Sequence, residues 1–403
     1  MLRKLLRELS TLPRFIYLLA VVAIFGLGVG AYRMVVGLGA TTNLSKVFPW
    51  GIWISFDLAT VALAGGAFIL ATLVYVFQFE DLHAALRPTI LAGLVGESGV
   101  LVILLFDLGR WDHSYNVFLH PNFSSALLIV AWCLALYFAL LVVEFSPVVL
   151  QKSRLRWLLP TIQKFTVPMV IVAGTLATIH QASLGTLFVI MSPRLHPLWH
   201  SMLLPVFFLI SAVPAGISLV IAGATISYWL LGRSLKTQTI AKLDWFLPWL
   251  LGFYLVLKLG ELQITDELGL LFSSGAYSLL FGAELIVGVL IPIILFAFRW
   301  VRTSRLGSMV GALMIIAGIV LNRFDVTWFA LNPGSGQIYM PHWMEVAIVV
   351  GIAAGMVLIY SLIARYFPVF EETVAVRRTT FGAIQRENKH ETTLSASGAV
   401  HGR

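Results

Sequence analysis

Long apolar stretches recur along the chain and are separated by short polar segments. A helix that crosses the hydrocarbon core of a membrane needs about 20 apolar residues. Ten stretches meet this requirement, and we predict a spanning helix for each, over residues 15–37, 50–77, 88–108, 123–145, 165–191, 202–231, 245–264, 276–298, 306–322 and 343–366. The ninth is the shortest of them. The pattern therefore predicts an all-α polytopic membrane protein.

The composition supports this fold class and excludes others. Of the 403 residues, 59% are hydrophobic and only 11% are charged, whereas ordinary globular domains carry about 25% charged residues. A chain with so few charges cannot cover a surface that faces water. A soluble enzyme, a nucleic-acid-binding protein and a disordered protein are therefore excluded.

The two ends of the chain differ from the predicted membrane domain, which covers residues 15–366. Residues 1–14 are basic and amphipathic, and no small-residue cleavage site follows them, so we interpret them as an uncleaved cytoplasmic arm. Residues 367–403 are polar, small and mixed in charge. This composition predicts a cytoplasmic tail that is partly disordered.

Arginine and lysine predict the orientation of the spans. Of the 27 basic residues, 21 fall in the termini and in the connections on the same side, and 6 fall in the opposite connections or the adjoining helix ends. Basic residues accumulate on the cytoplasmic side of membrane proteins. We therefore expect both termini in the cytoplasm, and we attribute the net charge of +8 to topology and not to nucleic-acid binding.

Cysteine and histidine are too scarce for most metal centres. Cys133 is the only cysteine, which excludes an intrachain disulfide, a cysteine-ligated iron–sulfur cluster and a cysteine-based zinc site. Of the nine histidines, only His180 lies well inside a predicted span. Because a di-haem cytochrome b needs paired histidines on facing helices, we expect no haem and no metal site in this chain.

Ionisable side chains inside the predicted spans are candidate functional residues, because each is costly in a membrane. A rise of about 1.5 Å per residue places most of them in the outer half of the membrane or at its edge. These are Asp57, Asp107, His180, Lys258, Glu261, Glu284, Arg323 and Glu345. By the same measure Glu97 lies near the middle and Glu144 near the cytoplasmic end.

Structural alternatives remain for several of these residues. Lys258 and Glu261 share one helical face and can neutralise each other, and Arg323 with Asp325 allows the same interpretation. His180 can form an interhelical hydrogen bond supported by Gln181 and Ser183.

A polar pocket in the outer third of a helical bundle suits a quinone headgroup. Its carbonyls need hydrogen-bond donors and a proton source, which histidine and a carboxylic acid supply, and its isoprenoid tail needs an apolar exit. A secondary transporter stays open as an alternative, because Pro205, Pro214 and Pro292 permit the broken helices on which transporters bind their substrates. A purely structural membrane anchor is the third possibility.

Several motifs resemble one known family. They are FPWGIWISFDLATVALAGGAF (48–68), LRP (86–88), FDLGRW (106–111), VEFSP (143–147), IHQASLGTLF (179–188), HPLW (196–199), KLGEL (258–262) and FALNPGSGQIYMPHWMEV (329–346). With these blocks in order, the chain resembles the NrfD/polysulfide-reductase family of quinone-interacting membrane subunits. Within that family it is most similar to the HybB-type subunits of periplasm-facing nickel–iron hydrogenases.

The resemblance implies a fold and a set of partners. It implies two four-helix bundles plus two extra helices in the cytoplasmic membrane of a bacterium or archaeon, with no haem, iron–sulfur cluster or flavin in this chain. It also implies a site for menaquinone or ubiquinone near the outer face. Electrons would come from a periplasmic four-cluster iron–sulfur subunit attached to a hydrogenase. Because similar subunits serve other respiratory reductases, a different electron donor remains an alternative.

The resemblance also assigns candidate site residues. The quinone-binding candidates are Asp57, Asp107, Arg110, His180, Lys258 and Glu261. We expect His180 to bind one quinone carbonyl, Asp107 or Asp57 to supply a proton to the other, and Arg110 to hold a carboxylate ionised.

Two further expectations concern protons and electrons. Glu97, Glu144 and Glu284 are the candidates for a proton relay to the cytoplasm. The last cluster of the iron–sulfur partner should lie just above the loops that carry Arg110, Trp111, His113, Trp199 and Trp343.

Overall fold

The computed structural model describes residues 13–79, 82–151, 153–191, 194–231, 235–331 and 338–370. Residues 1–12, in the predicted arm, and 371–403, in the predicted tail, lie outside this range. In the described part, ten helices are long and apolar enough to span a membrane, at the ten predicted positions. Apart from an isolated bridge between Leu195 and Leu331, this part contains no β structure. The all-α polytopic fold is confirmed.

Seven of the ten spans are single continuous helices. They are α2 (Arg14–Val36), α6 (His83–Asp107), α8 (Ala126–Leu150), α10 (Thr166–Ile190), α11 (Leu204–Leu231), α12 (Thr237–Ile264) and α18 (Trp343–Tyr366). Short helices occur in the connections, namely α3 (Leu38–Thr41), η2 (Trp111–His113), α7 (Asn116–Leu119), η3 (Arg156–Leu158), α9 (Leu159–Lys164), α13 (Leu270–Ser273) and α16 (Arg299–Thr303).

The other three spans change helix type or break along their length. The second consists of α4 (Ile52–Ala64) and α5 (Gly66–Tyr75), and the eighth runs from α14 (Ala276–Leu285) through the π-helical η5 (Ile286–Leu290) into α15 (Ile291–Ala297). The ninth continues from α17 (Arg305–Phe324) into the π-helical η6 (Asp325–Phe329). It is longer than predicted because Arg323 and Asp325 interrupt the apolar pattern although both are buried.

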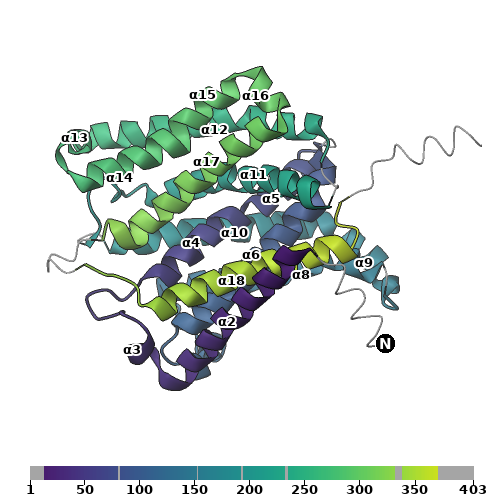
Figure 1. Ribbon diagram of the computed structural model, residues 1–403, viewed down its shortest axis with the longest axis horizontal. Helices are drawn as coiled ribbons and strands as arrows, with labels where there is room; N and C mark the ends of the chain where they lie inside the picture. The colour runs from purple at the N-terminus through teal and green to yellow at the C-terminus, as the bar shows by residue number, and fades with distance from the viewer. Residues whose placement is uncertain are drawn as a thin grey trace, which may run out of the picture. The chain divides into compact units, whose positions relative to one another are not determined.

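Eight of the spans form two four-helix bundles (Figure 1). In bundle 1, the α4–α5 helix, α6, α8 and α10 pack in a ring, and in bundle 2 α11, α12, the α14–α15 helix and α17 do the same. The bundles meet where α4, α5 and α10 contact α11 and where α4 contacts α17. The two remaining spans, α2 and α18, pack against each other and against α6. The predicted arrangement of two bundles with two extra helices is therefore confirmed.

Glycine allows some of these helices to approach closely. Gly26 of α2 faces Gly351 of α18, and Gly66 faces Gly216 across the two bundles. A Cβ atom added at any of these positions would clash with the backbone of the facing helix. Small residues at such crossings are typical of helix packing in membranes, where dispersion forces hold helices together.

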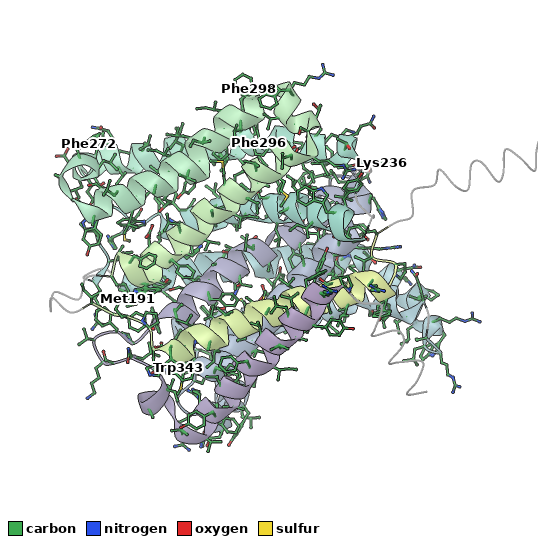
Figure 2. The ribbon with its side chains drawn as sticks, in the orientation of Figure 1. Met191, Lys236, Phe272, Phe296, Phe298 and Trp343 are labelled. Atoms are coloured by element: carbon green, nitrogen blue, oxygen red, sulfur yellow. The ribbon has the colours of Figure 1, made fainter. Side chains whose placement is uncertain are left out.

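The connections lie at two opposite ends of the helices. Figure 2 shows Met191, Phe272 and Trp343 at one end and Lys236 at the other. We call the first the outer end and the second the inner end, following the orientation that the basic residues predict.

Candidate functional site

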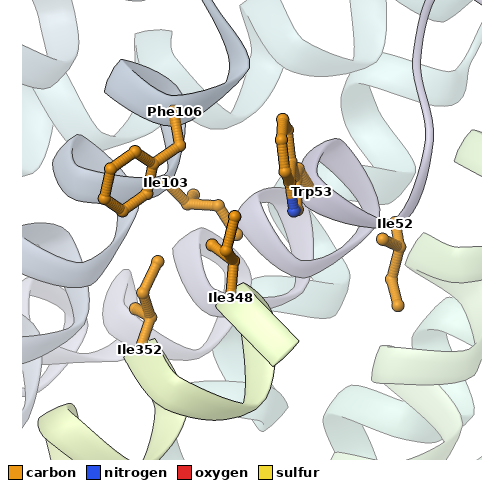
Figure 3. Packing of buried hydrophobic residues seen from close by; sticks show 6 residues of the cluster. All are labelled: Ile52, Trp53, Ile103, Phe106, Ile348 and Ile352. Carbon is orange, nitrogen blue, oxygen red and sulfur yellow. The ribbon is translucent and has the colours of Figure 1, made fainter. Parts of the chain in front are cut away.

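The outer end of bundle 1 contains a tightly packed apolar cluster. Trp53 and Ile52 at the start of α4 pack with Ile103 and Phe106 of α6 and with Ile348 and Ile352 of α18 (Figure 3). The indole Nε1 of Trp53 donates a hydrogen bond of 3.1 Å to the carbonyl oxygen of Glu345. This cluster fixes the ends of α4 and α6, from which Asp57 and Asp107 project.

Glu345 ties the outer loops together above this cluster. Its carboxylate accepts hydrogen bonds from the Tyr339 hydroxyl at 2.5 Å and from the backbone N–H groups of Asn43 at 2.9 Å and His342 at 2.7 Å. The Tyr339 hydroxyl in turn accepts a bond of 3.3 Å from the N–H of Ile52. Burial and the bond to Glu345 raise the pKa of Tyr339, so this phenol stays protonated at physiological pH. The resulting network closes the outer end of the site.

Asp57 is buried and Asp107 is half-buried beneath this network. Asp57 is 5% exposed, and the two carboxyl groups are close enough to interact electrostatically. Asp107 also interacts with Glu345 and with Arg33 of α2. The Oδ1 atom of each aspartate has no hydrogen-bond partner among the described residues. Two carboxyl groups with unused hydrogen-bonding capacity thus lie close enough to interact electrostatically, and their assignment to a quinone pocket stays a prediction.

Arg33, and not Arg110, is the cation of this pair. The guanidinium of Arg33 is buried and donates a bond of 2.6 Å to the carbonyl oxygen of Leu108. The Arg110 side chain is 75% exposed and lies beside Asp112 and His113, and its hydrogen bond to Asp112 lowers the pKa of that carboxyl. Because α6 ends at Asp107, the chain has already turned away when it reaches Arg110. Arg110 was expected to hold a pocket carboxylate, but it lies beside Asp112. The cation that interacts with Asp107 is Arg33.

His180 lies on the inward face of α10 in bundle 1. It is buried, and neither ring nitrogen has a hydrogen-bond partner in the described part of the chain. The interhelical bond expected here comes instead from Gln181, whose Nε2 donates to the carbonyl oxygen of Val61 at 2.9 Å. Ser183 bonds only to the carbonyl oxygen of His180 in its own helix. The His180 ring is thus a buried polar group that lies beside the backbone of Val130 in α8, and only one of its ring nitrogens can face that backbone.

A line of titratable groups continues from Asp57 toward the inner end of bundle 1. Glu97 of α6 is fully buried, interacts electrostatically with Asp57, and has no hydrogen-bond partner among the described residues for either carboxyl oxygen. Tyr137 of α8 interacts with both Glu97 and Glu144. Its hydroxyl donates to the carbonyl oxygen of Ala64 at 3.4 Å, where the second span breaks. Tyr137 therefore links the two predicted relay residues of this bundle, a role that its apolar sequence surroundings did not signal.

Glu284 belongs to a separate polar cluster in bundle 2. Its carboxylate accepts hydrogen bonds from the Trp199 indole at 3.0 Å and from the Asn322 amide at 2.9 Å. Lys258 and Glu261 lie nearby as a buried ion pair with 3.6 Å between Nζ and Oε2, so they do neutralise each other. None of the interactions described links these three residues to Asp57 or Asp107, and the same is true of His180 in bundle 1. The predicted site residues are thus divided between the bundles.

Two further residues are buried at bundle 2. Trp199, whose loop is predicted to face the iron–sulfur partner, is 1% exposed and packs edge-on against Phe281. Arg323 forms hydrogen bonds with Ser211 at 2.8 Å and with the carbonyl oxygen of Phe208 at 3.1 Å. No ion pair between Arg323 and Asp325 is found in the described residues, and the carboxyl oxygens of Asp325 have no hydrogen-bond partner there.

Exposed aromatic side chains lie at the outer end of both bundles. Trp111, Tyr115 and Phe118 are exposed in the loops of bundle 1, Trp343 is exposed at the start of α18, and Phe272 is exposed in bundle 2. His113 stacks on Tyr115. Aromatic side chains in this arrangement supply contact area for a protein partner.

Comparison with known proteins identifies the family. A family model described as polysulphide reductase, NrfD, matches residues 40–334. The chain belongs to the NrfD family. Within it, the chain is 34% identical over 365 residues to a protein of Nitratidesulfovibrio vulgaris, covering 87% of this chain and 93% of that one.

Two further NrfD-family relatives have informative names. The probable Ni/Fe-hydrogenase 2 b-type cytochrome subunit of Escherichia coli is 32% identical over 343 residues, covering 84% of this chain and 87% of the relative. The menaquinone reductase integral membrane subunit of Nitratidesulfovibrio vulgaris is 29% identical over 401 residues, covering 92% and 96%. The chain is thus a homologue of membrane subunits of respiratory oxidoreductase complexes.

The name of the Escherichia coli relative raises the question of haem. Haem b held between helices is typically ligated by paired histidines. Of the histidines that the structure describes, only His180 lies more than one turn inside a spanning helix. No group of three or more His, Cys, Asp or Glu side chains is placed to hold a metal ion in the described residues. The described spans therefore do not offer the ligand pair that such a haem needs.

Proposed function

We propose that this NrfD-family chain is the quinone-reactive membrane subunit of a respiratory oxidoreductase, in which it passes electrons from an iron–sulfur partner to menaquinone or ubiquinone. The observation that carries the proposal is the Asp57–Asp107 pair with Arg33 at the outer end of bundle 1. Relatives named as a hydrogenase subunit and as a menaquinone reductase subunit support it. An uptake hydrogenase is the electron donor that we favour, and another respiratory reductase is the alternative.

The two aspartates suit the proton chemistry of quinone reduction. A quinone takes up two electrons and two protons to become a quinol, so each carbonyl oxygen gains one proton. Like charges repel strongly in a low-dielectric interior, which favours a state in which only one of Asp57 and Asp107 is charged and the other carries a proton. In our proposal this proton passes to one carbonyl oxygen, and Arg33 then stabilises the carboxylate that remains.

His180 donates a hydrogen bond to the other carbonyl oxygen in this proposal, and the second proton reaches that oxygen through water from the aspartates once they have been reprotonated. A neutral imidazole carries one N–H donor and one acceptor nitrogen, and both nitrogens of His180 lack a partner among the described residues. Because the ring is buried and only the Val130 backbone is described beside it, a bound headgroup can take up the capacity of the nitrogen that does not face Val130.

The line of groups below Asp57 suits a proton supply from the inner end. Glu97, Tyr137 and Glu144 follow one another through bundle 1, each interacting electrostatically with the next. We propose that they reprotonate the aspartate pair, with bridging water where the gaps exceed hydrogen-bond length. Glu284 has no part in this version of the relay, since it is held by Trp199 and Asn322 in bundle 2.

The exposed aromatic rim is the proposed docking surface of the electron-donating partner. Trp111, Tyr115 and Trp343 lie at the outer end of the helices, as the two aspartates do. A partner seated there would bring an iron–sulfur cluster near the quinone headgroup. The predicted orientation places this surface in the periplasm and both termini in the cytoplasm.

Substitution of His180 tests the proposed function. In the His180→Ala variant, we expect electron flow from the donor to quinone to fall at least about 100-fold, the usual contribution of a positioned acid–base group. The complex should still assemble, and the donor should still reduce an artificial dye. Normal quinone reduction by the assembled variant would remove His180 from the mechanism.

A further inference from the structure

A large apolar cavity lies on the inner side of the aspartate pair. Its volume is about 480 Å³, and it is lined by both bundles and by the α2–α18 pair but is partly open at the surface of the helices. The lining side chains come from α2, α4, α6, α11, α17 and α18, and include Leu63, Val95, Val220, Ile316 and Met356. The cavity therefore belongs to no single bundle.

A space of this size is unlike the voids of ordinary protein packing. Protein interiors contain few voids larger than a water molecule, and an engineered apolar cavity of about 150 Å³ already stays dry and binds benzene. The present cavity is about three times larger and lies within membrane-spanning helices. Hydrocarbon is the solvent that surrounds these helices, so a hydrocarbon chain is the occupant that the lining favours.

The two ends of the cavity differ in polarity. Toward the inner end the lining includes Tyr360, Ser361 and Arg365 of α18, and the hydroxyl of Tyr360 interacts with Ser227 of α11. Toward the middle of the membrane, Thr60 is a lone polar side chain among apolar lining residues of α4. An occupant that fits must have a polar, acceptor-rich head at the inner surface and an apolar chain that points inward.

We propose that this cavity holds an acyl chain of an anionic phospholipid whose phosphate group lies at Arg365. An arginine binds phosphate through charge-assisted hydrogen bonds, and basic residues at the inner membrane surface attract anionic lipids. The lipid would then fill the space between the bundles and the α2–α18 pair and hold these three parts together.

A quinone in this cavity fits less well. Arg365 follows Trp343 by 22 residues in α18, which corresponds to about 33 Å along the helix. A quinone headgroup at the Arg365 end would therefore lie far from the outer rim, and one at the Thr60 end would find a lone polar side chain on α4. The phospholipid assignment does not depend on the proposed quinone site.

Glycine substitutions test the occupant of the cavity. Gly223 lines the cavity, and a Cβ atom added there meets nothing within 4 Å, so Gly223→Leu should fill the space without a backbone clash. Gly252 of α12 is the matched control, since an added Cβ also meets nothing within 4 Å there and the residue does not line the cavity. Ala353→Leu, also in the lining, provides a second filling variant should the first fail to fold.

The measurement is native mass spectrometry of the purified complex with added palmitoyl-oleoyl phosphatidylglycerol or phosphatidylcholine. We expect the unaltered complex to retain one tightly bound phosphatidylglycerol and the Gly252→Leu complex to do the same. Gly223→Leu and Ala353→Leu should lose it. In Arg365→Gln the affinity for phosphatidylglycerol should fall about fivefold, as expected for one basic residue, whereas Arg299→Gln at the same end should have no effect.

Three results would overturn the proposal. The first is equal retention of phosphatidylglycerol by the filled and the control variants. The second is equal affinity for phosphatidylglycerol and phosphatidylcholine in the unaltered complex, and the third is a co-purifying quinone that Gly223→Leu displaces. Because Gly223 and Ala353 lie outside the proposed quinone site, failure of the lipid proposal leaves the His180 test unaffected.

Discussion

Arg33 and Arg110 illustrate what single residues reveal in this chain. Both belong to the few basic residues on the outer side. The motif FDLGRW led us to name Arg110, and not Arg33, as the candidate pocket cation. Arg33 is buried against Leu108, whereas Arg110 is exposed. The sequence did contain a signal for Arg33, because it lies inside an apolar stretch. A cation within a span is rare and is a candidate functional residue.

Neutralising the two arginines should therefore have different effects. In Arg33→Gln, Asp107 loses its buried cation and the carbonyl of Leu108 loses a charge-assisted hydrogen bond, an effect of about 1.5–3 kcal/mol. We expect quinone reduction to fall about 10- to 100-fold. Arg110→Gln is the control and should reduce quinone normally. Steady-state assays of both variants check this, and equal losses would contradict the role assigned to Arg33.

Glu97 is buried, as expected for a carboxyl group inside a span, but the sequence did not predict which residues surround it. The residues that surround it come from α4 and α8, which are distant in sequence, and hydropathy alone cannot pair helices. The intramembrane position was predictable because charged residues are rare there. The link to Glu144 through Tyr137 became visible only in the folded chain.

The proposed relay predicts a separable loss of proton movement. Glu97→Gln keeps the shape of the side chain but cannot release a proton. In vesicles containing the reconstituted complex, the variant should assemble and lose charge translocation, measured with a membrane-potential dye. An unchanged potential signal at an unchanged rate of quinone reduction would show that protons do not pass through Glu97.

Whole helices were easier to predict than their interruptions. The length and apolar character of each stretch determined all ten spans, because a span must satisfy its backbone hydrogen bonds within itself. The break between α4 and α5 falls at Gly65, and its only sequence signal is the Gly65–Gly66 pair. Beside it, Gln181 and Tyr137 donate to the carbonyl oxygens of Val61 and Ala64 from other helices.

The contact between α2 and α18 gives a test at the scale of elements. A side chain at Gly26 would clash with the backbone of Gly351 and Ala347, whereas one at Gly28 meets nothing within 4 Å. Gly26→Leu should therefore destabilise the protein by about 1–3 kcal/mol or more, and Gly28→Leu should not. Thermal unfolding in detergent compares the two variants. Equal stabilities would mean that the two helices do not pack as described.

At the scale of the whole molecule, the division into two bundles determines which buried polar residues can belong to the same site. From sequence, Lys258, Glu261 and Glu284 seemed to share one depth with Asp57 and Asp107. Depth along a helix follows from residue spacing, but the lateral position depends on which helices are neighbours. The structure places the first three in bundle 2, where Lys258 and Glu261 are paired.

The most direct test of the account is to locate the quinone itself. The purified complex is incubated with a photoactivatable menaquinone analogue that carries its reactive group on the headgroup, and the labelled peptides are mapped by mass spectrometry. The account predicts labels in α4, α6 and α10, near Asp57, Asp107 and His180, which excess menaquinone removes. Displaceable labels confined to α12 and α14, near Lys258 and Glu284, would contradict it.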